Sequence, residues 1–176
     1  PAGLALWGRV IWREGADGLS QLVAGYLALT VLGLHGFGLL RDGLGFVWMG
    51  WLIAVVIASD VAGYFIGRVV GGPKFWPSVS PKKTWSGTVA GWIAAAGVGA
   101  AFAGPLGAGG ALVALSVVVA AAGQGGDIAE SALKRRAGVK DSSQLIPGHG
   151  GLADRFDAML AAALVAWIAL LTGLVA

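Results

Sequence analysis

Five long apolar segments constrain this chain more than any other feature of its sequence. They run approximately over Leu19–Leu34, Leu44–Gly67, Gly87–Gly104, Gly109–Gly126 and Ala158–Ala176. A helix needs roughly 17–25 mostly apolar residues to cross a bilayer, and the first segment meets this length if it extends toward Leu40. We therefore expect an all-α, polytopic integral membrane protein with about five transmembrane helices and two basic cytoplasmic loops.

The low charge of the chain supports a lipid environment. Of its 176 residues, 57% are hydrophobic and 12% are charged, and the mean hydropathy is +0.80. Soluble domains average about 25% charged residues, so a water-soluble fold of this length would have too few polar groups to cover its surface. The 31 glycines suit close packing of membrane helices. The absence of Cys excludes disulfides and thiolate metal sites.

Basic residues fall almost entirely on one side of the predicted bundle. Eleven of the twelve Lys and Arg residues lie in the N-terminal segment or in two of the four connections, and the exception is Arg41 in the expected loop His35–Gly43. We interpret the other short connection, Pro105–Ala108, as a tight helical hairpin. Because Lys and Arg concentrate in cytoplasmic loops, we expect the N-terminus inside and the C-terminus outside. His35 then lies in an outer loop without catalytic neighbours.

A polar stripe follows the fourth apolar segment. Asp127, Glu130, Ser131 and Lys134 recur at helical spacing and so share one helix face. A helix that emerges into water accounts for such a stripe, and for Glu130 a solvated face is a sufficient explanation. Asp127 is different, because a carboxylate at membrane depth costs about 2.5–3.5 kcal/mol and usually has a partner.

A glycine-rich loop and a second pair of carboxylates come next. The run Pro147–Gly151 offers backbone N–H groups to an anion, and we expect a helix to begin near Leu152. Asp154 and Asp157 then lie one turn apart on one face. One Asp at that position would merely favour the helix N-terminus, whereas two that face Asp127 indicate a divalent-cation site. Carboxylate ligands favour Mg²⁺, and a second cation beside it stays open. The many surrounding basic residues indicate a polyphosphate ligand.

Two further stretches carry polar groups. Ser80, Lys82, Lys83 and Thr84 precede the third helix and offer phosphate-binding chemistry, although a positive-inside anchor explains this segment alone at least as well. Asp60 lies inside the second apolar segment, where an ionisable residue is a functional candidate. Structural pairing with another helix explains Asp60 equally well.

Together these motifs resemble the CDP-diacylglycerol synthase family, also called phosphatidate cytidylyltransferase. The resemblance rests on Ser131-x-x-Lys134-Arg135, Lys140-Asp141, Pro147-Gly148-His149-Gly150-Gly151 and Asp154-Arg155-x-Asp157, and on the blocks ASDVAGYFIGR, SPKKTWSG and GGDIAES. It runs from about Trp51 to the C-terminus, with Ser86 at a position where the family commonly has an acidic residue. Because family members usually have further membrane helices before this region, residues 1–50 resemble a truncated N-terminal part, with an amphipathic segment and the first membrane helix. Residues 51–176 resemble the catalytic membrane domain.

The resemblance implies that CTP and phosphatidate react to give CDP-diacylglycerol and pyrophosphate at the cytoplasmic side of an inner membrane. With the patterns above, it implies catalytic roles for Asp127, Asp154, Lys134, Arg135 and His149. It implies Mg²⁺ ligands at Asp127, Asp154 and Asp157. It implies substrate contacts at Ser80, Lys82, Lys83, Thr84, Ser131, Lys140, Asp141, Gly150, Gly151, Arg155 and Asp60.

Other readings of these residues stay open. A related CTP-dependent isoprenoid-lipid enzyme, similar to CDP-archaeol synthase, would share the same headgroup chemistry. An ion-coupled transporter would use Asp60 and Asp127 as a relay, but transporters often show repeated halves, whereas here the charge lies on one face. The expected partners are CTP, phosphatidate and the bilayer, because basic loops of a membrane protein favour anionic lipid over nucleic acid. Glycine-rich helices also permit a homodimer.

Overall fold

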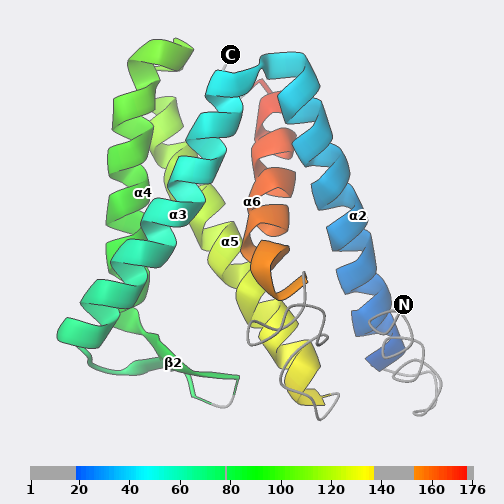
Figure 1. Ribbon diagram of the computed structural model, residues 1–176, viewed down its shortest axis with the longest axis vertical. Coiled ribbons are helices and arrows are strands. Elements are labelled where there is room, and N and C mark those ends of the chain that lie inside the picture. The colour runs from blue at the N-terminus through cyan, green and yellow to red at the C-terminus, as the bar shows by residue number, and fades with distance from the viewer. Residues whose placement is uncertain (1–18, 78, 137–152, 174–176) are drawn as a thin grey trace.

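The computed structural model describes residues 19–77, 79–136 and 153–173, and this part of the chain is mostly helical. The helices are α2 (Leu19–Leu44), α3 (Phe46–Val69), α4 (Trp85–Leu106), α5 (Ala111–Arg136) and α6 (Ala153–Leu171). They run alternately up and down, so the bundle has two distinct ends (Figure 1). We call the end with the α2–α3 and α4–α5 joins the turn end, and the end with Arg68, Lys83 and Lys134 the charged end.

The first helix is longer than the sequence suggested. The apolar residues beyond Leu34 continue α2 as far as Leu44, and the chain turns only at Gly45, whose φ of 84° suits glycine. The expected outer loop His35–Gly43 is therefore wrong. His35 lies within α2, and its ring contacts Trp167 of α6 edge-on, with the ring centroids 5.7 Å apart.

The join between α4 and α5 agrees with the predicted helical hairpin. Pro105 lies in the last turn of α4, and Gly107 ends that helix with a φ of 65°. The turn itself is made by residues 107–110, and α5 begins at Ala111. Glycine is favoured at such a helix end because it adopts the left-handed conformation without steric cost.

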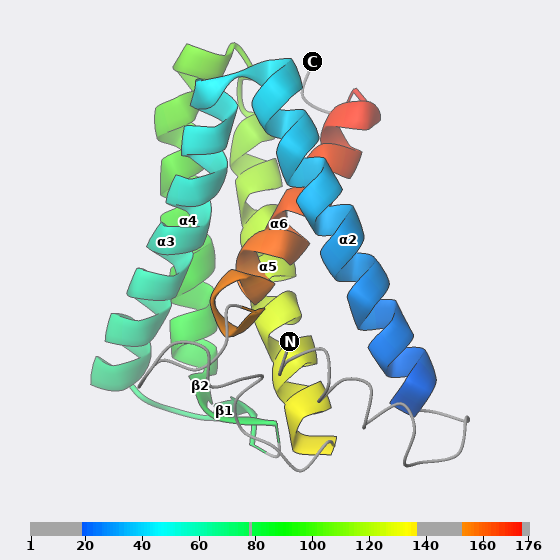
Figure 2. The ribbon, with the colours of Figure 1, turned by 45° about the vertical axis from the view of Figure 1, so that its right-hand side comes forward.

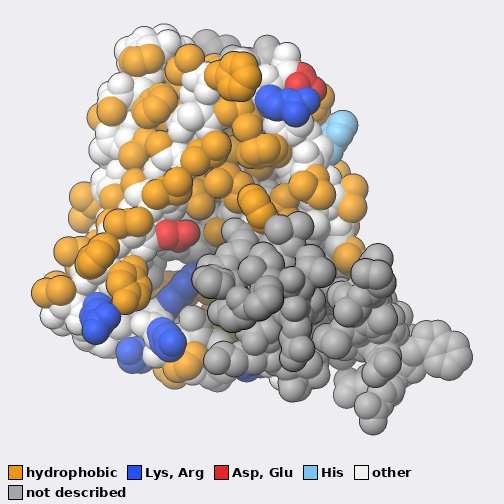
Figure 3. Space-filling view, viewed as in Figure 1, with side chains coloured by type: hydrophobic (Ala, Val, Ile, Leu, Met, Phe, Trp, Pro, Cys, Tyr) orange, Lys and Arg blue, Asp and Glu red, His pale blue; other side chains and the backbone are white. Residues whose placement is uncertain are grey.

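Three helices in the described residues are long and apolar enough to cross a membrane, namely Phe46–Val69, Trp85–Leu106 and Ala111–Arg135. The other two helices contain shorter apolar stretches, Thr30–Leu39 and Phe156–Leu171. Apolar side chains cover much of the outer face of the bundle (Figure 3). An exposed apolar surface of this extent indicates contact with lipid, so the chain is an integral membrane protein. The count of five spans stays a prediction.

Glycines let the helices approach closely. The pairs α3–α4, α5–α6, α2–α6 and α4–α5 pack most extensively, and α2 diverges from α3 toward the charged end (Figures 1 and 2). A methyl group added at Gly87 of α4 would overlap the Gly63 carbonyl oxygen of α3. One added at Gly126 of α5 would lie 2.8 Å from the Asp157 carbonyl oxygen of α6. Small residues at these crossings therefore set the positions of the polar side chains nearby.

A β-hairpin between α3 and α4 departs from the all-α expectation. Its strands, β1 (Lys74–Trp76) and β2 (Ser80–Thr84), pair antiparallel. Prolines at positions 73, 77 and 81 prevent a helix here. Thr84 ends β2 and caps α4, since its Oγ1 accepts a hydrogen bond from the Gly87 N–H at 3.2 Å. The ring of Phe75 lies 4.6 Å from that of Trp85, so the hairpin is fixed to the start of α4.

Candidate active site

A pocket of about 970 Å³ lies at the charged end, among α3, the hairpin, α4, α5 and α6. Its charged lining residues are Asp60, Arg68, Lys74, Lys82, Lys83, Asp127 and Asp157. Apolar residues of α3 and α6 also line it, namely Val56, Ile57, Phe156 and Met159. One cavity therefore offers carboxylates, ammonium groups and an apolar wall. Lys and Arg side chains gather at this end below the apolar outer face (Figure 3).

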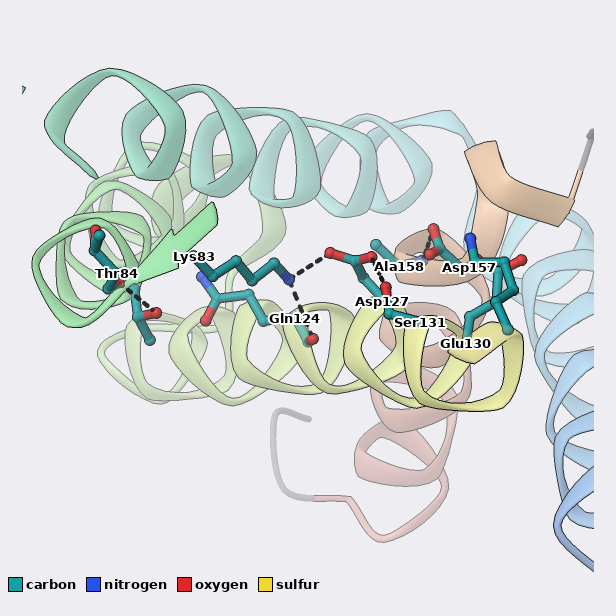
Figure 4. Close-up of polar contacts among 10 residues, drawn as sticks. Lys83, Thr84, Gln124, Asp127, Glu130, Ser131, Asp157 and Ala158 are labelled. Atoms are coloured by element: carbon teal, nitrogen blue, oxygen red, sulfur yellow. Dashed lines mark hydrogen bonds and ion pairs between the residues drawn. The ribbon is translucent and has the colours of Figure 1, made fainter. Parts of the chain in front are cut away.

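Asp127 and Lys83 meet across the pocket. Asp127 follows the apolar half of α5, and Lys83 reaches it from β2, where its ammonium group forms an ion pair with Asp127 Oδ2 (Figure 4). Lys83 Nζ also donates to the Gln124 carbonyl oxygen at 3.5 Å. Ser131 Oγ donates to Asp127 Oδ1 at 3.5 Å. The partner that we expected for an intramembrane carboxylate is thus a cation from the hairpin.

Glu130 and Asp157 lie together where α5 meets α6 (Figure 4). Asp157 is 8% exposed, and its Oδ1 accepts a hydrogen bond from the Ala158 N–H at 2.7 Å. Glu130 is fully buried, and its Oε2 lies 3.5 Å from Lys134 Nζ. The expectation of a solvated face for Glu130 is therefore wrong. Gly126 brings α5 so close to α6 that this part of the stripe faces a helix instead of water.

Asp60 lines the same pocket from α3. It is exposed to the cavity, and it interacts electrostatically with Lys83, Asp127 and Asp157. Within the residues that the structure describes, Asp60 makes no hydrogen bond or ion pair. Its position favours a role in the pocket over structural pairing between helices.

The other described candidates divide into two groups. Lys82 and Thr84 of β2 line the pocket, although the Thr84 hydroxyl already caps α4. Ser80, Lys134 and Arg135 do not line it. Lys134 is paired with Glu130, and Arg135 is exposed near the end of α5.

Several predicted site residues lie outside the described part of the chain. These are Lys140, Asp141, His149, Gly150 and Gly151. The backbone of Asp154 and Arg155 belongs to the first turn of α6, but their side chains also lie outside it. Their catalytic, metal-binding and substrate-binding roles stay predictions.

Sequence reasoning missed other residues that line the pocket. Gln124 lies three residues before Asp127, so helical spacing alone would have placed it on the same face of α5. Arg68 and Tyr64 line the pocket from the last two turns of α3, and Arg68 Nη1 donates to Tyr64 Oη at 3.0 Å. The ASDVAGYFIGR block contains both residues, but neither is among the predicted site residues.

The donors around Asp127 fit a magnesium ion that arrives with a polyphosphate. Among the described residues, no three Asp, Glu or His side chains lie close enough to hold a metal by themselves. Mg²⁺ requires fewer protein ligands, since it binds through one or two carboxylates together with phosphate oxygens and water. The Asp127 carboxylate is partly exposed to the pocket and already binds a cationic group, the Lys83 ammonium.

The fold and the pocket define an integral membrane protein with a pocket of acidic and basic side chains at one end of its helical bundle. The chain belongs to the cytidylyltransferase family, since the model of that family matches residues 13–172. This match reaches further toward the N-terminus than Trp51, where the recognisable motifs begin.

Three curated relatives share one name. Phosphatidate cytidylyltransferase of Brucella suis biovar 1 is 40% identical over 173 residues, which cover 95% of this chain and 62% of that protein. The Helicobacter pylori protein of the same name is 42% identical over 130 residues, 73% of this chain and 48% of that protein. The Mycobacterium tuberculosis protein is 42% identical over 127 residues, 70% of this chain and 38% of that protein. This chain thus spans less than two thirds of the length of these relatives.

Proposed function

We propose that this chain carries the catalytic part of a phosphatidate cytidylyltransferase, which makes CDP-diacylglycerol and pyrophosphate from CTP and phosphatidate. The observation that carries this proposal is that one pocket at the charged end combines carboxylates, ammonium groups and apolar side chains. A soluble nucleotide and a lipid headgroup require such a mixed surface. The shared name of the relatives supports the same activity.

In this reaction a phosphate oxygen of phosphatidate attacks the α-phosphorus of CTP, and pyrophosphate leaves. The second pKa of a phosphate monoester is about 6, so the attacking group is largely ionised at pH 7 and needs no strong base. The main difficulty is to bring two anions together in the correct alignment. Lys82 and Lys83 line the pocket and are suited to hold the triphosphate.

Mg²⁺ is part of the proposal. Asp127 and Asp157 line the pocket from two helices, and they would hold the ion together with Asp154. When bound, Mg²⁺ supplies positive charge that neutralises the phosphate oxygens of the transition state. Phe156 and Met159 of α6 lie beside the carboxylates. They would direct the lipid chains into the apolar part of the pocket while the headgroup stays among the charges.

We further propose that all five helices cross the membrane and that the charged end faces the cytoplasm. At 1.5 Å per residue, the 26 residues of α2 and the 19 residues of α6 extend about 39 Å and 28 Å, against a hydrocarbon core of about 30 Å. Thiol labelling of single Cys substitutions tests this topology. Ser142→Cys should be labelled from the cytoplasmic side and Ala108→Cys from the other side. Labelling of Ser142→Cys from outside alone would reverse the orientation.

The activity is tested directly with the intact purified protein in detergent. Radiolabelled CTP should be converted to a CDP-lipid only when Mg²⁺ and phosphatidate are both present. Conversion with an isoprenoid phospholipid acceptor but not with phosphatidate would favour the isoprenoid-lipid alternative. No turnover with either acceptor, in a protein that unfolds cooperatively, would reject the proposed function.

A further inference from the structure

The contact between Lys83 and Asp127 joins the hairpin to α5. The ammonium nitrogen of Lys83 contacts two acceptors of α5, Asp127 Oδ2 and the Gln124 carbonyl oxygen (Figure 4). The Lys83 side chain is 28% exposed and that of Asp127 38%. Lys83 is therefore held inside the pocket by acceptors about one helical turn apart, and it does not extend freely into solvent.

The neighbouring Lys82 differs in this respect. Lys82 is exposed, and within the described residues it forms no ion pair, although it lines the same pocket. The same residue type thus occurs twice in succession, once against the carboxylate and once exposed. The chain itself supplies a matched comparison for the role of Lys83.

We propose that Lys83 is the counter-cation of Asp127 in the unliganded protein, and that it changes partner to the triphosphate when a divalent cation binds Asp127. This inference rests on the proposed function, because it assigns the order in which the groups of the pocket meet the nucleotide and its cation. Lys83 is then both the competitor of the metal and a ligand of the nucleotide.

Electrostatics favours such an exchange. A divalent cation in contact with Asp127 would repel an ammonium group that binds the same carboxylate, so it weakens the ion pair with Lys83. The phosphate oxygens that accompany the cation offer the ammonium group a new set of acceptors in the same pocket. The cation alone therefore binds weakly, and cation and nucleotide strengthen each other's binding, a coupling that must be reciprocal.

Binding of Mn²⁺, measured by electron paramagnetic resonance, tests this role without turnover. The experiment uses the intact protein in detergent, first without nucleotide and then with CTP but no lipid acceptor. In Lys83→Met the affinity for Mn²⁺ alone should rise about tenfold or more. A neighbouring cation lowers the affinity of a carboxylate for a proton by about tenfold to a thousandfold, and it lowers the affinity for a metal ion for the same electrostatic reason. Lys82→Met is the matched control. It should change Mn²⁺ affinity by less than about threefold, because exposed charges interact weakly.

The second readout is the coupling between the two ligands. CTP should strengthen Mn²⁺ binding in the wild type, and it should do so much less in Lys83→Met. Lys83→Arg keeps the charge and should retain weak binding of Mn²⁺ alone. If Lys83→Met does not fold, Lys83→Gln repeats the test, because it removes the charge and keeps a hydrogen-bond donor.

Two results would overturn the inference. One is Mn²⁺ affinity in the uncharged Lys83 variants that does not exceed that of the wild type. The other is an equal gain in Lys82→Met. These outcomes are separate from failure of the proposed function, which is read from CDP-lipid formation by the wild type. An active wild type without the Lys83 effect rejects this inference alone.

Discussion

The two ends of the bundle are built from the same helices but differ in what lies between them. At the turn end, Trp51 and Leu52 of α3 and Leu112 and Ser116 of α5 are almost completely excluded from solvent. At the charged end the same two helices diverge enough, with the hairpin, to line a pocket that contains Asp60 and other charged groups. Because one end is closely packed and the other contains a polar cavity, we expect the turn end to contribute mainly to stability and the charged end mainly to activity.

Helix α5 shows how one element serves both ends. Its first half, from Ala111 to Ala122, contains a single polar residue, Ser116, whereas its second half carries Gln124, Asp127 and Glu130. Burial continues through both halves, since Ser116 and Glu130 are each 0% exposed. Polarity along a helix therefore does not report exposure here. Polar residues of α5 instead occur where a neighbouring element offers a polar partner.

The largest expected effect is on turnover at the charged end. Asp127→Asn keeps the size of the side chain and removes its charge, so it should lower CDP-lipid formation about a thousandfold or more, equivalent to roughly 4 kcal/mol of barrier. Its effect on unfolding should stay below about 1 kcal/mol, because the ion pair with Lys83 is partly exposed. Mg²⁺-dependent turnover and thermal unfolding of the intact protein measure both quantities.

Asp42→Asn provides the matched control at the turn end. Asp42 is exposed and forms an ion pair with Arg41 at 2.8 Å, and its substitution should change turnover by no more than about twofold. Near-normal turnover in Asp127→Asn, or an equal loss in Asp42→Asn, would remove the functional difference between the two ends.

The next effect concerns the free energy of unfolding, and it tests whether the Glu130 carboxylate at the charged end is buried. Glu130→Ala leaves Lys134, which is only 15% exposed, without the carboxylate that it pairs with. Breaking a buried ion pair costs about 3–5 kcal/mol, so the variant should unfold at a clearly lower temperature. Replacing both partners, with Glu130→Leu and Lys134→Met, should recover part of the stability, because an apolar pair of similar volume no longer buries the Lys134 charge next to an apolar residue. A loss below about 1 kcal/mol in Glu130→Ala would indicate a solvated carboxylate after all.

The burial of Glu130 also marks where sequence reasoning reached its limit. Hydropathy placed the helices correctly to within several residues at most ends, because lipid demands a long apolar stretch wherever a helix crosses it. The polar stripe on α5 was also correct as a pattern. A one-dimensional pattern cannot tell whether a polar helix face meets water or a neighbouring helix. The sequence therefore predicted a solvated Glu130, whereas the close packing of α6 buries it.

The hairpin was missed for a different reason. Lys74, Lys82 and Lys83 resemble an ordinary positive-inside loop, and a short strand pair leaves little periodicity in the sequence. The pairing of the strands decides that Lys83 points to Asp127 while Lys82 does not. The role of this segment in phosphate binding stays a prediction, and the sequence could not assign different roles to two adjacent lysines.

Two glycines of α4, one at each end of the bundle, lie so close to a neighbouring helix that substitution by Ala would overpack both sites. A methyl group at Gly87 would overlap Gly63 of α3 at the charged end, and one at Gly99 would lie 2.8 Å from Val113 Cα of α5 at the turn end. Overpacking of this kind costs about 1–3 kcal/mol, so Gly87→Ala and Gly99→Ala should lose similar stability. Only Gly87→Ala should also reduce turnover at a temperature where both variants are folded, because Gly87 lines the pocket.

Gly97→Ala serves as the control for the helix itself, since no described atom lies within 4 Å of the added methyl group. It should be neutral or slightly stabilising, because alanine favours helix more than glycine does. Equal losses of turnover in Gly87→Ala and Gly99→Ala would mean that the two ends are coupled through α4 and do not act independently.

The smallest effect is expected for a hydrogen bond in the core of the turn end. Trp51 Nε1 donates to Ser116 Oγ at 2.9 Å, and Ser116 Oγ donates in turn to the Leu112 carbonyl oxygen at 2.7 Å. Ser116→Ala removes the acceptor and leaves the buried indole N–H without a partner, which costs about 1–3 kcal/mol. Adding Trp51→Phe to Ser116→Ala removes that unsatisfied donor, so the double variant should be less destabilised than the sum of the two single variants. Thermal unfolding of the four proteins measures this coupling, and turnover at a permissive temperature should be the same in all of them. A change of turnover that exceeds the loss of folded protein would show that the packed end also tunes the chemistry.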